Sequence, residues 1–197
     1  YAGRGDDTVD ALGGADVIYG NEGTDTLRGG DGNDTLFSGE GDGGELDGGA
    51  GNDLFYVDAE NTAVTEAAAG GTDTVYTSVD IELAAGSEVE RIYTQNYLGI
   101  DGLTMVGSNI NNDIRGNQGN NMLDGRGGND TMYGYGGDDV FYVDSAFDLT
   151  YETAGGGNDT VLTSIDRTLR SVDEIESLRA VNEESTTGLT LIGNSLA

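Results

Sequence analysis

The sequence has 197 residues, with 37 acidic and 8 basic side chains and a formal net charge of −29. This charge disfavours nucleic acid and anionic membrane surfaces as partners, because both would repel the chain. No stretch is long and apolar enough to span a bilayer, and no secretory signal opens the sequence. Cys and His are absent, which excludes disulfides, zinc sites and Ser-His or Cys-His catalysis, so we expect no enzymatic activity in this segment.

A nine-residue phrase repeats from the first residues onward. It has glycine in the first, second and fourth places, aspartate in the sixth and an apolar residue in the eighth, as in GGDGNDTLF at 29–37. A first run of six units occupies 2–56, in which the unit at 38–47 is one residue too long. A second run of four units occupies 107–142. Such a register over two runs excludes chance and predicts a repeat architecture.

The first six residues of each unit have the composition of a cation-binding loop. Glycine in three places permits positive φ and close backbone approach, so that carbonyl oxygens can turn inward, and the aspartate adds a carboxylate. Carbonyl and carboxylate oxygens suit Ca²⁺, which accepts six to eight such ligands in flexible geometry. Zinc would require Cys or His, and magnesium requires a stricter octahedron. The loops therefore predict calcium.

The last three residues of each unit are expected to form a short strand with its middle side chain turned inward. The residues in the eighth place are all apolar: Val9, Ile18, Leu27, Leu36, Leu46, Phe55, Ile114, Leu123, Met132 and Phe141. Burying one of them contributes about 1.5–3 kcal/mol, whereas ordering nine residues costs about 1–2 kcal/mol each in backbone entropy. We therefore expect metal binding to supply the missing stability.

A longer repeat of 86 residues encloses the short one, since 48–58 matches 134–144 and 102–110 matches 188–196. This repeat and the missing initiator Met predict a segment of a longer tandem array. The expected parts are a first run at 1–58, a spacer at 59–101, a second run at 102–144, a spacer at 145–187 and the start of a third run at 188–197. The spacers read as irregular β structure, either as wider coils of the same solenoid or as small sandwiches between separate rolls.

These units resemble the RTX (repeats-in-toxin) family. The resemblance implies an all-β, right-handed parallel β-roll, in which two nonapeptides make one turn and each ion lies between two stacked loops. It implies the pairs Asp7 with Asp25, Asp16 with Asp34, Asp34 with Asp53, Asn112 with Asp130, and Asn121 with Asp139. The implied metal ligands are Asp7, Asp16, Asp25, Asp34, Asp53, Asp130, Asp139, Asn112 and Asn121, with Gly3, Gly5, Gly14, Gly23, Gly30, Gly32, Gly49, Gly51, Gly119, Gly128 and Gly137. About five ions are expected, the strongest within 16–53.

Several units depart from this pattern. The unit at 38–47 has Gly43 and Gly44 where the aspartate belongs, and Asp42 is a substitute left open. Asparagine at the sixth place of two units in the second run removes charge and predicts weaker sites there. Outside the runs, Asp73 and Asp159 stand like sixth-place residues, and the sequence leaves open whether they are ligands or parts of a structural turn.

The resemblance implies a non-catalytic segment of a larger secreted protein, which leaves a Gram-negative cell by type I export and folds on Ca²⁺ outside. The alternative is a stalk or glycan-binding module of a large adhesin or surface-layer protein, with a cell-surface polysaccharide as partner. The aromatic residues in the ninth place are expected to face outward, where they either stack on sugar rings or pack across strands. They are Tyr19, Phe37, Tyr56, Tyr133 and Tyr142. The oligomeric state stays open.

Overall fold

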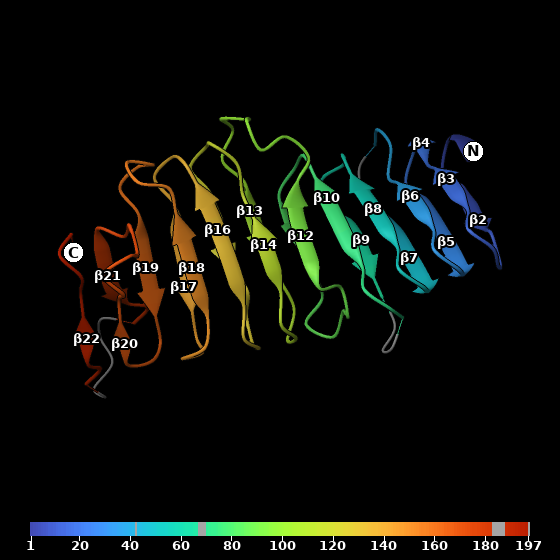
Figure 1. Ribbon diagram of the computed structural model, residues 1–197. Helices are drawn as coiled ribbons and strands as arrows, with labels where there is room; N and C mark the ends of the chain where they lie inside the picture. Colours follow the sequence, from blue (N-terminus) through green and yellow to red (C-terminus); the bar gives the residue numbers. More distant parts are fainter. Residues whose placement is uncertain (42, 67–69, 183–187, 197) are drawn as a thin grey trace. The chain divides into compact units, whose positions relative to one another are not determined.

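The computed structural model describes residues 1–41, 43–66, 70–182 and 188–196, and these residues form strands, turns and loops. None of the described residues forms a helix with the length and hydropathy needed to cross a membrane. The chain separates into two units, Tyr1–Gln95 and Asn96–Ala197. Each unit is built from short parallel strands stacked as a β-solenoid, which confirms the expected all-β fold (Figure 1).

Strands of the first unit alternate along the chain between two parallel sheets. One sheet has the order β2-β5-β7-β9, the other contains β3-β6-β8-β10-β12 in that order, and β1 pairs with β4. The strands are β1 (Gly3–Arg4), β2 (Thr8–Asp10), β3 (Val17–Tyr19), β4 (Asn21–Glu22), β5 (Asp25–Asp31), β6 (Thr35–Phe37), β7 (Gly44–Ala50), β8 (Leu54–Val57), β9 (Thr62–Thr65), β10 (Thr74–Thr77), β11 (Ile81–Glu82) and β12 (Arg91–Thr94).

The register of these sheets matches the expected turn of two nonapeptides. Val9 of β2 lies opposite Leu27 of β5, and Ile18 of β3 lies opposite Leu36 of β6, so each partner is eighteen residues further along the chain. The overlong unit at 38–47 is accommodated, because Leu27 still pairs with Leu46, nineteen residues on. The inward ladder therefore runs without a break through the first run.

The eighth-place side chains form the core of both units. All of them are buried except Val9 of β2, which is partly exposed. Phe55 and Phe141, the largest, have no exposed surface. Three-residue strands such as β6 and β14 bury one side chain each, and β8 and β17 add Val57 and Val143, so the core is narrow on each side of the solenoid. Such a core is too thin to order the glycine loops by itself.

Residues 59–66 and 70–95 continue the first solenoid. Strand β9 pairs with β7, and β10 pairs in parallel with β8 on one side and with β12 on the other. Of the two interpretations of the spacer, this pairing favours wider coils over separate sandwiches. The sequence SEVERIYTQ at 87–95 is compatible with a strand or a short amphipathic helix and favours strand, and the structure places β12 there.

The second unit repeats this plan. One sheet contains β13-β15-β17-β19-β21 in that order, the other contains β14-β16-β18, and β20 pairs with β22. Ile114 lies opposite Met132, and Leu123 lies opposite Phe141, again eighteen residues apart. The strands are β13 (Thr104–Val106), β14 (Asp113–Arg115), β15 (Met122–Asp124), β16 (Thr131–Tyr135), β17 (Val140–Val143), β18 (Leu149–Glu152), β19 (Thr160–Thr163), β20 (Arg167–Thr168), β21 (Ser177–Ala180) and β22 (Leu191–Ile192).

Candidate functional site

The loop glycines divide into two kinds. Those in the second and fourth places have left-handed backbone, as Gly30 at φ 104° and Gly32 at φ 135° illustrate. The other predicted glycines of this kind are Gly3, Gly5, Gly14, Gly23, Gly49, Gly51, Gly128 and Gly137. Glycine in the first place has a different reason: a Cβ on Gly29 would collide with Oδ2 of Asp34 and lie 2.7 Å from the carbonyl oxygen of Gly48. Positive φ and close backbone approach were expected at all three places, and glycine in the first place provides only the close approach.

The loop conformation is imposed even where glycine is missing. In the second place, Leu12 (φ 71°), Asn21 (φ 69°), Arg126 (φ 58°) and Tyr135 (φ 76°) all adopt left-handed backbone. Residues with a Cβ lose about 1–2 kcal/mol in this region. Stacking against neighbouring coils therefore holds the loop in one shape against local preference.

The sixth-place aspartates form rows along the solenoid. The amide of Asp16 donates to Oδ1 of Asp34 at 2.8 Å, and the amide of Asp34 donates to Oδ1 of Asp53 at 2.7 Å. The row continues from Asp53 to Asp73 at 2.7 Å and ends on Oε2 of Glu90 at 2.8 Å. On the other edge, the amide of Asp7 donates to Oδ1 of Asp25 at 2.8 Å. These contacts confirm the stacking expected for the first run.

In five row aspartates of the first unit, the second carboxylate oxygen faces a space without donors. Oδ2 is buried and has no hydrogen-bond partner in Asp16, Asp25, Asp34, Asp53 and Asp73. Leaving a buried charged acceptor unsatisfied costs more than about 1–3 kcal/mol. First-place glycines border this space, as the clash at Gly29 shows. It is lined by carboxylate and carbonyl oxygens, the donor set of a hard cation, so these residues fit calcium.

Two similar rows cross the second unit. In one, the amide of Asn112 donates to Oδ1 of Asp130 at 2.7 Å, and the amide of Asp130 donates to Oδ1 of Asp148 at 2.9 Å. In the other, Asn121 donates to Asp139 at 2.6 Å, Asp139 to Asp159 at 2.8 Å, and Asp159 to Oε2 of Glu176 at 2.8 Å. Asp73 and Asp159, left open by the sequence, thus occupy the sixth-place position.

Burial raises the pKa of several row carboxyls. It raises the pKa of Asp130 and Asp139 to about 7, and that of Asp73 and Asp159 to about 6. For Glu152, burial and then the charges of Asp159 and Asp139 raise the pKa to about 9. The rows therefore hold negative charge poorly when nothing positive lies between the carboxylates.

Asparagine changes the chemistry of its coil. Oδ1 of Asn121 accepts the amide of Leu103 at 3.3 Å, which turns Nδ2 toward the space that Oδ2 of an aspartate faces. There Nδ2 donates to the carbonyl of Gly119 at 2.6 Å and to Oδ1 of Asp139 at 3.0 Å. Asn112 is turned the other way, and its Oδ1 accepts the amide of Ser108 at 2.9 Å. The amide group of Asn121 thus satisfies some of the oxygens that line this space.

Comparison with known families decides what these loops are. The model of the RTX calcium-binding nonapeptide repeat matches the chain in four copies, at 1–36, 10–44, 45–62 and 106–145, which together cover just over half of its length. The chain belongs to the RTX family. No curated protein and no solved structure matches it. The chain is therefore an RTX calcium-binding repeat segment with a parallel β-roll fold.

Two residues that the sequence marked, one as a departure from the RTX phrase and one as a member of it, differ from its regular loops. Gly44 lies opposite Asp25, where a sixth-place aspartate would stand, so this coil offers no sixth-place carboxylate to the row. Asp42, the proposed substitute, lies outside the described residues. Gly119 is not in the left-handed region described for Gly137 and instead offers its carbonyl to Asn121.

Four glutamates of this RTX chain were not predicted. Glu90 and Glu176 end the aspartate rows, and Glu66 and Glu152 lie beside row aspartates. None stands in a nonapeptide, so the phrase could not reveal them. The 86-residue repeat carries the signal, because Glu66 recurs as Glu152 and Glu90 as Glu176.

Aromatic side chains of the first unit stack on one another. Tyr19 stacks on Phe37 with ring centroids 4.6 Å apart, and Phe37 stacks on Tyr56 at 4.6 Å. In the second unit, Tyr133 stacks on Tyr151 at 4.8 Å, with Arg115 over its ring. Of the two roles left open, these contacts favour packing across strands, because the faces that a sugar would need are covered.

Proposed function

We propose that this RTX segment is a non-catalytic folding module of a larger secreted protein, exported by a type I route and ordered by Ca²⁺ outside the cell. The observation that carries the proposal is the set of buried Oδ2 atoms without hydrogen-bond partners, such as those of Asp16, Asp34 and Asp130. Inside a cell, where free calcium is scarce, their burial opposes folding. Calcium outside would remove that penalty.

The proposed ligands are the sixth-place aspartates and the loop carbonyls around them, which would hold about five ions. Asn112 is proposed as a weak ligand, since Oδ1 is the atom that a Cβ on Gly107 would meet. Asn121 is left out, because its Nδ2 already donates to the carbonyl of Gly119. The runs at 1–58 and 102–144, the spacers at 59–101 and 145–187 and the start of a third run at 188–197 are proposed as the parts of this module.

Thermodynamic linkage gives the stability that calcium binding adds to the folded chain. Each independent site stabilises the folded chain by about 2.7 kcal/mol when calcium is a hundredfold above its Kd. About five sites therefore contribute more than about 10 kcal/mol, as much as the whole stability of many domains. Sites of about 10⁻⁴–10⁻³ M affinity are sufficient outside the cell.

The test is circular dichroism of this segment in EDTA and in millimolar Ca²⁺, with ions counted by titration calorimetry. We expect β structure only with calcium. Asp34→Asn should shift the calcium midpoint upward, whereas Asp31→Asn, an equal charge change on an exposed residue of the same loop, should not. Equal β signal with and without calcium would refute the proposal.

A stalk or glycan-binding role is not proposed. The rings of Tyr19, Phe37 and Tyr56 are turned face to face, so the described residues offer no observation that favours sugar binding. The role of this segment within a larger protein is tested separately, by the neighbouring sequence. A catalytic domain in the neighbouring sequence would support the exported-module proposal, whereas many further 86-residue copies would favour a stalk.

A further inference from the structure

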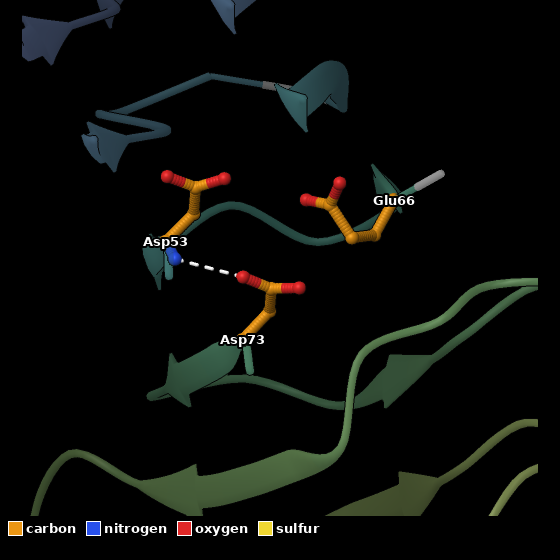
Figure 2. A group of neighbouring side chains, drawn as sticks. All are labelled: Asp53, Glu66 and Asp73. Atoms are coloured by element: carbon orange, nitrogen blue, oxygen red, sulfur yellow. Dashed lines mark hydrogen bonds between the residues drawn. The ribbon is translucent and has the colours of Figure 1, made fainter. Parts of the chain in front are cut away.

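Each unit contains a glutamate that turns toward two row aspartates. In the first unit Glu66 lies with Asp53 and Asp73, and Figure 2 shows their carboxylates directed at one space. One oxygen from each of the three lies within 4.8 Å of the others. Glu66 directly follows β9, which pairs with β7, so the pairing of coils brings it beside the loop that begins at Gly48.

The glutamate stands where other coils place a backbone carbonyl. The space beside Gly29 is bordered by the carbonyl oxygen of Gly48, and the space beside Gly20 by that of Ser38. Beside Gly48 the corresponding neighbour is Oε2 of Glu66, with Oδ2 of Asp53 at 2.5 Å from the position of a Cβ. A side-chain carboxylate thus replaces a neutral carbonyl at the last loop of the run.

A second observation points to a ligand. Asp53 and Asp73 have no exposed surface, and Oδ2 of each has no hydrogen-bond partner. Oδ1 of Asp73 is occupied by the amide of Asp53, so the free oxygen is the one left for the shared space. Three buried carboxylates around one space repel one another and require a positive charge between them.

The arrangement occurs again 86 residues later. Asp139, Glu152 and Asp159 place one oxygen each within 4.8 Å of the others, and a Cβ on Gly134 would collide with Oε1 of Glu152 and Oδ2 of Asp139. Asp139 and Asp159 are also buried. The same residue types in the same geometry, at the end of both runs, indicate a built site.

We propose that each cluster is a three-carboxylate Ca²⁺ site that closes its run of RTX loops and binds more tightly than the loop sites. The inference rests on the proposed function. Two oxygens bound to one calcium ion at about 2.4 Å lie at most about 4.8 Å apart, which matches the clusters. Three negative charges against two positive ones exceed what a loop of carbonyls and one or two aspartates offers, and ligand charge raises calcium affinity.

The experiment is calcium binding to Glu66→Gln, Glu152→Gln and the double variant, measured by competition with a chromophoric chelator. Glu60→Gln, on an exposed residue of the same coil, is the matched control. We expect two tight sites in the unaltered protein, one in each single variant and none in the double variant, with affinity at the altered cluster lowered by about tenfold or more. Unchanged tight sites in the double variant would overturn the inference.

Two further readouts separate the possible failures. If the double variant still folds on calcium but keeps both tight sites, the clusters are not calcium sites and the proposed function stands. If the unaltered protein neither folds on calcium nor binds it, both proposals fail. Should glutamine prevent folding, the assigned ¹³C carboxyl signals of Glu66 and Glu152 in the unaltered protein decide: a shift with the first two equivalents of calcium is expected, and no shift at saturation overturns the inference.

Discussion

Replacing Asp34 with asparagine should move the stability of the calcium-free and the calcium-loaded chain in opposite directions. Oδ1 of Asp34 accepts the amide of Asp16 at 2.8 Å, so the new amide nitrogen would occupy the position of Oδ2, as Nδ2 of Asn121 does in its coil. It would replace a buried acceptor without a donor by a donor close to the carbonyl of Gly48. Without calcium, the free energy of unfolding should rise by about 2 kcal/mol.

With calcium, Asp34→Asn should instead lower the free energy of unfolding. The Asp34 carboxylate lies in a row between Asp16 and Asp53 and is placed to serve two neighbouring sites. Losing two sites removes about 5 kcal/mol of calcium-linked stability at a hundredfold excess over Kd, which outweighs the gain of about 2 kcal/mol. The reciprocal change, Asn121→Asp, should lower stability without calcium and enlarge the calcium-dependent increment.

The assay is urea unfolding followed by circular dichroism, in EDTA and in millimolar Ca²⁺, with a constant concentration of trimethylamine N-oxide so that the calcium-free chain folds. Asp31→Asn is the control for charge alone. If Asp34→Asn lowered the free energy of unfolding equally in both conditions, the aspartate would act through packing and not through an ion, and the reasoning would fail.

Three other predictions follow from the site. Without calcium, the free energy of unfolding should rise as pH falls from about 9 to about 4. Asp73, Asp139 and Glu152 have pKa values of about 6, 7 and 9 in the folded chain and therefore bind more protons folded than unfolded. In the presence of calcium, the same fall in pH should raise the calcium midpoint, and circular dichroism at fixed pH values measures both effects. Gly48→Ala should weaken calcium binding in calorimetry, because its Cβ would fill the space between Asp53 and Glu66, while Gly86→Ala, with nothing within 4 Å, should have no effect. Leu12→Gly should raise the free energy of unfolding in calcium by about 0.5–1 kcal/mol, since Leu12 is exposed and left-handed; a loss of stability would show that its side chain packs.

The inward ladder could be predicted from local periodicity, and the parallel fold and the stacking register could be predicted from the resemblance to the RTX family. An apolar residue every ninth place defines the ladder, and its pairing eighteen residues apart places Asp16 beside Asp34. The overlong unit did not break this rule, since glycines at its centre absorb the extra residue in left-handed backbone.

The parts that escaped prediction depend on contacts between coils. Glu66 reaches Asp53 because β9 pairs with β7, a contact with no trace in the nonapeptide. The orientation of Asn121 depends on a donor from Leu103, in the preceding coil. The sequence shows which residue type occupies each place of the nonapeptide. Which atom of an asparagine faces the ion space is decided by the neighbouring coil.

The amide-to-carboxylate rows also have a polarity. In the sixth-place rows every amide donates toward the higher-numbered coil, from Asp16 to Asp34 and onward until Glu90, whereas the fifth-place amide of Thr24 donates back to Asp6. One end of a row therefore presents amide donors to a new coil and the other presents acceptors, so the two ends are chemically unlike. A coil can join such a row in one sense only. Tandem copies of this chain are thereby committed to head-to-tail growth, and a reversed copy would oppose acceptor to acceptor.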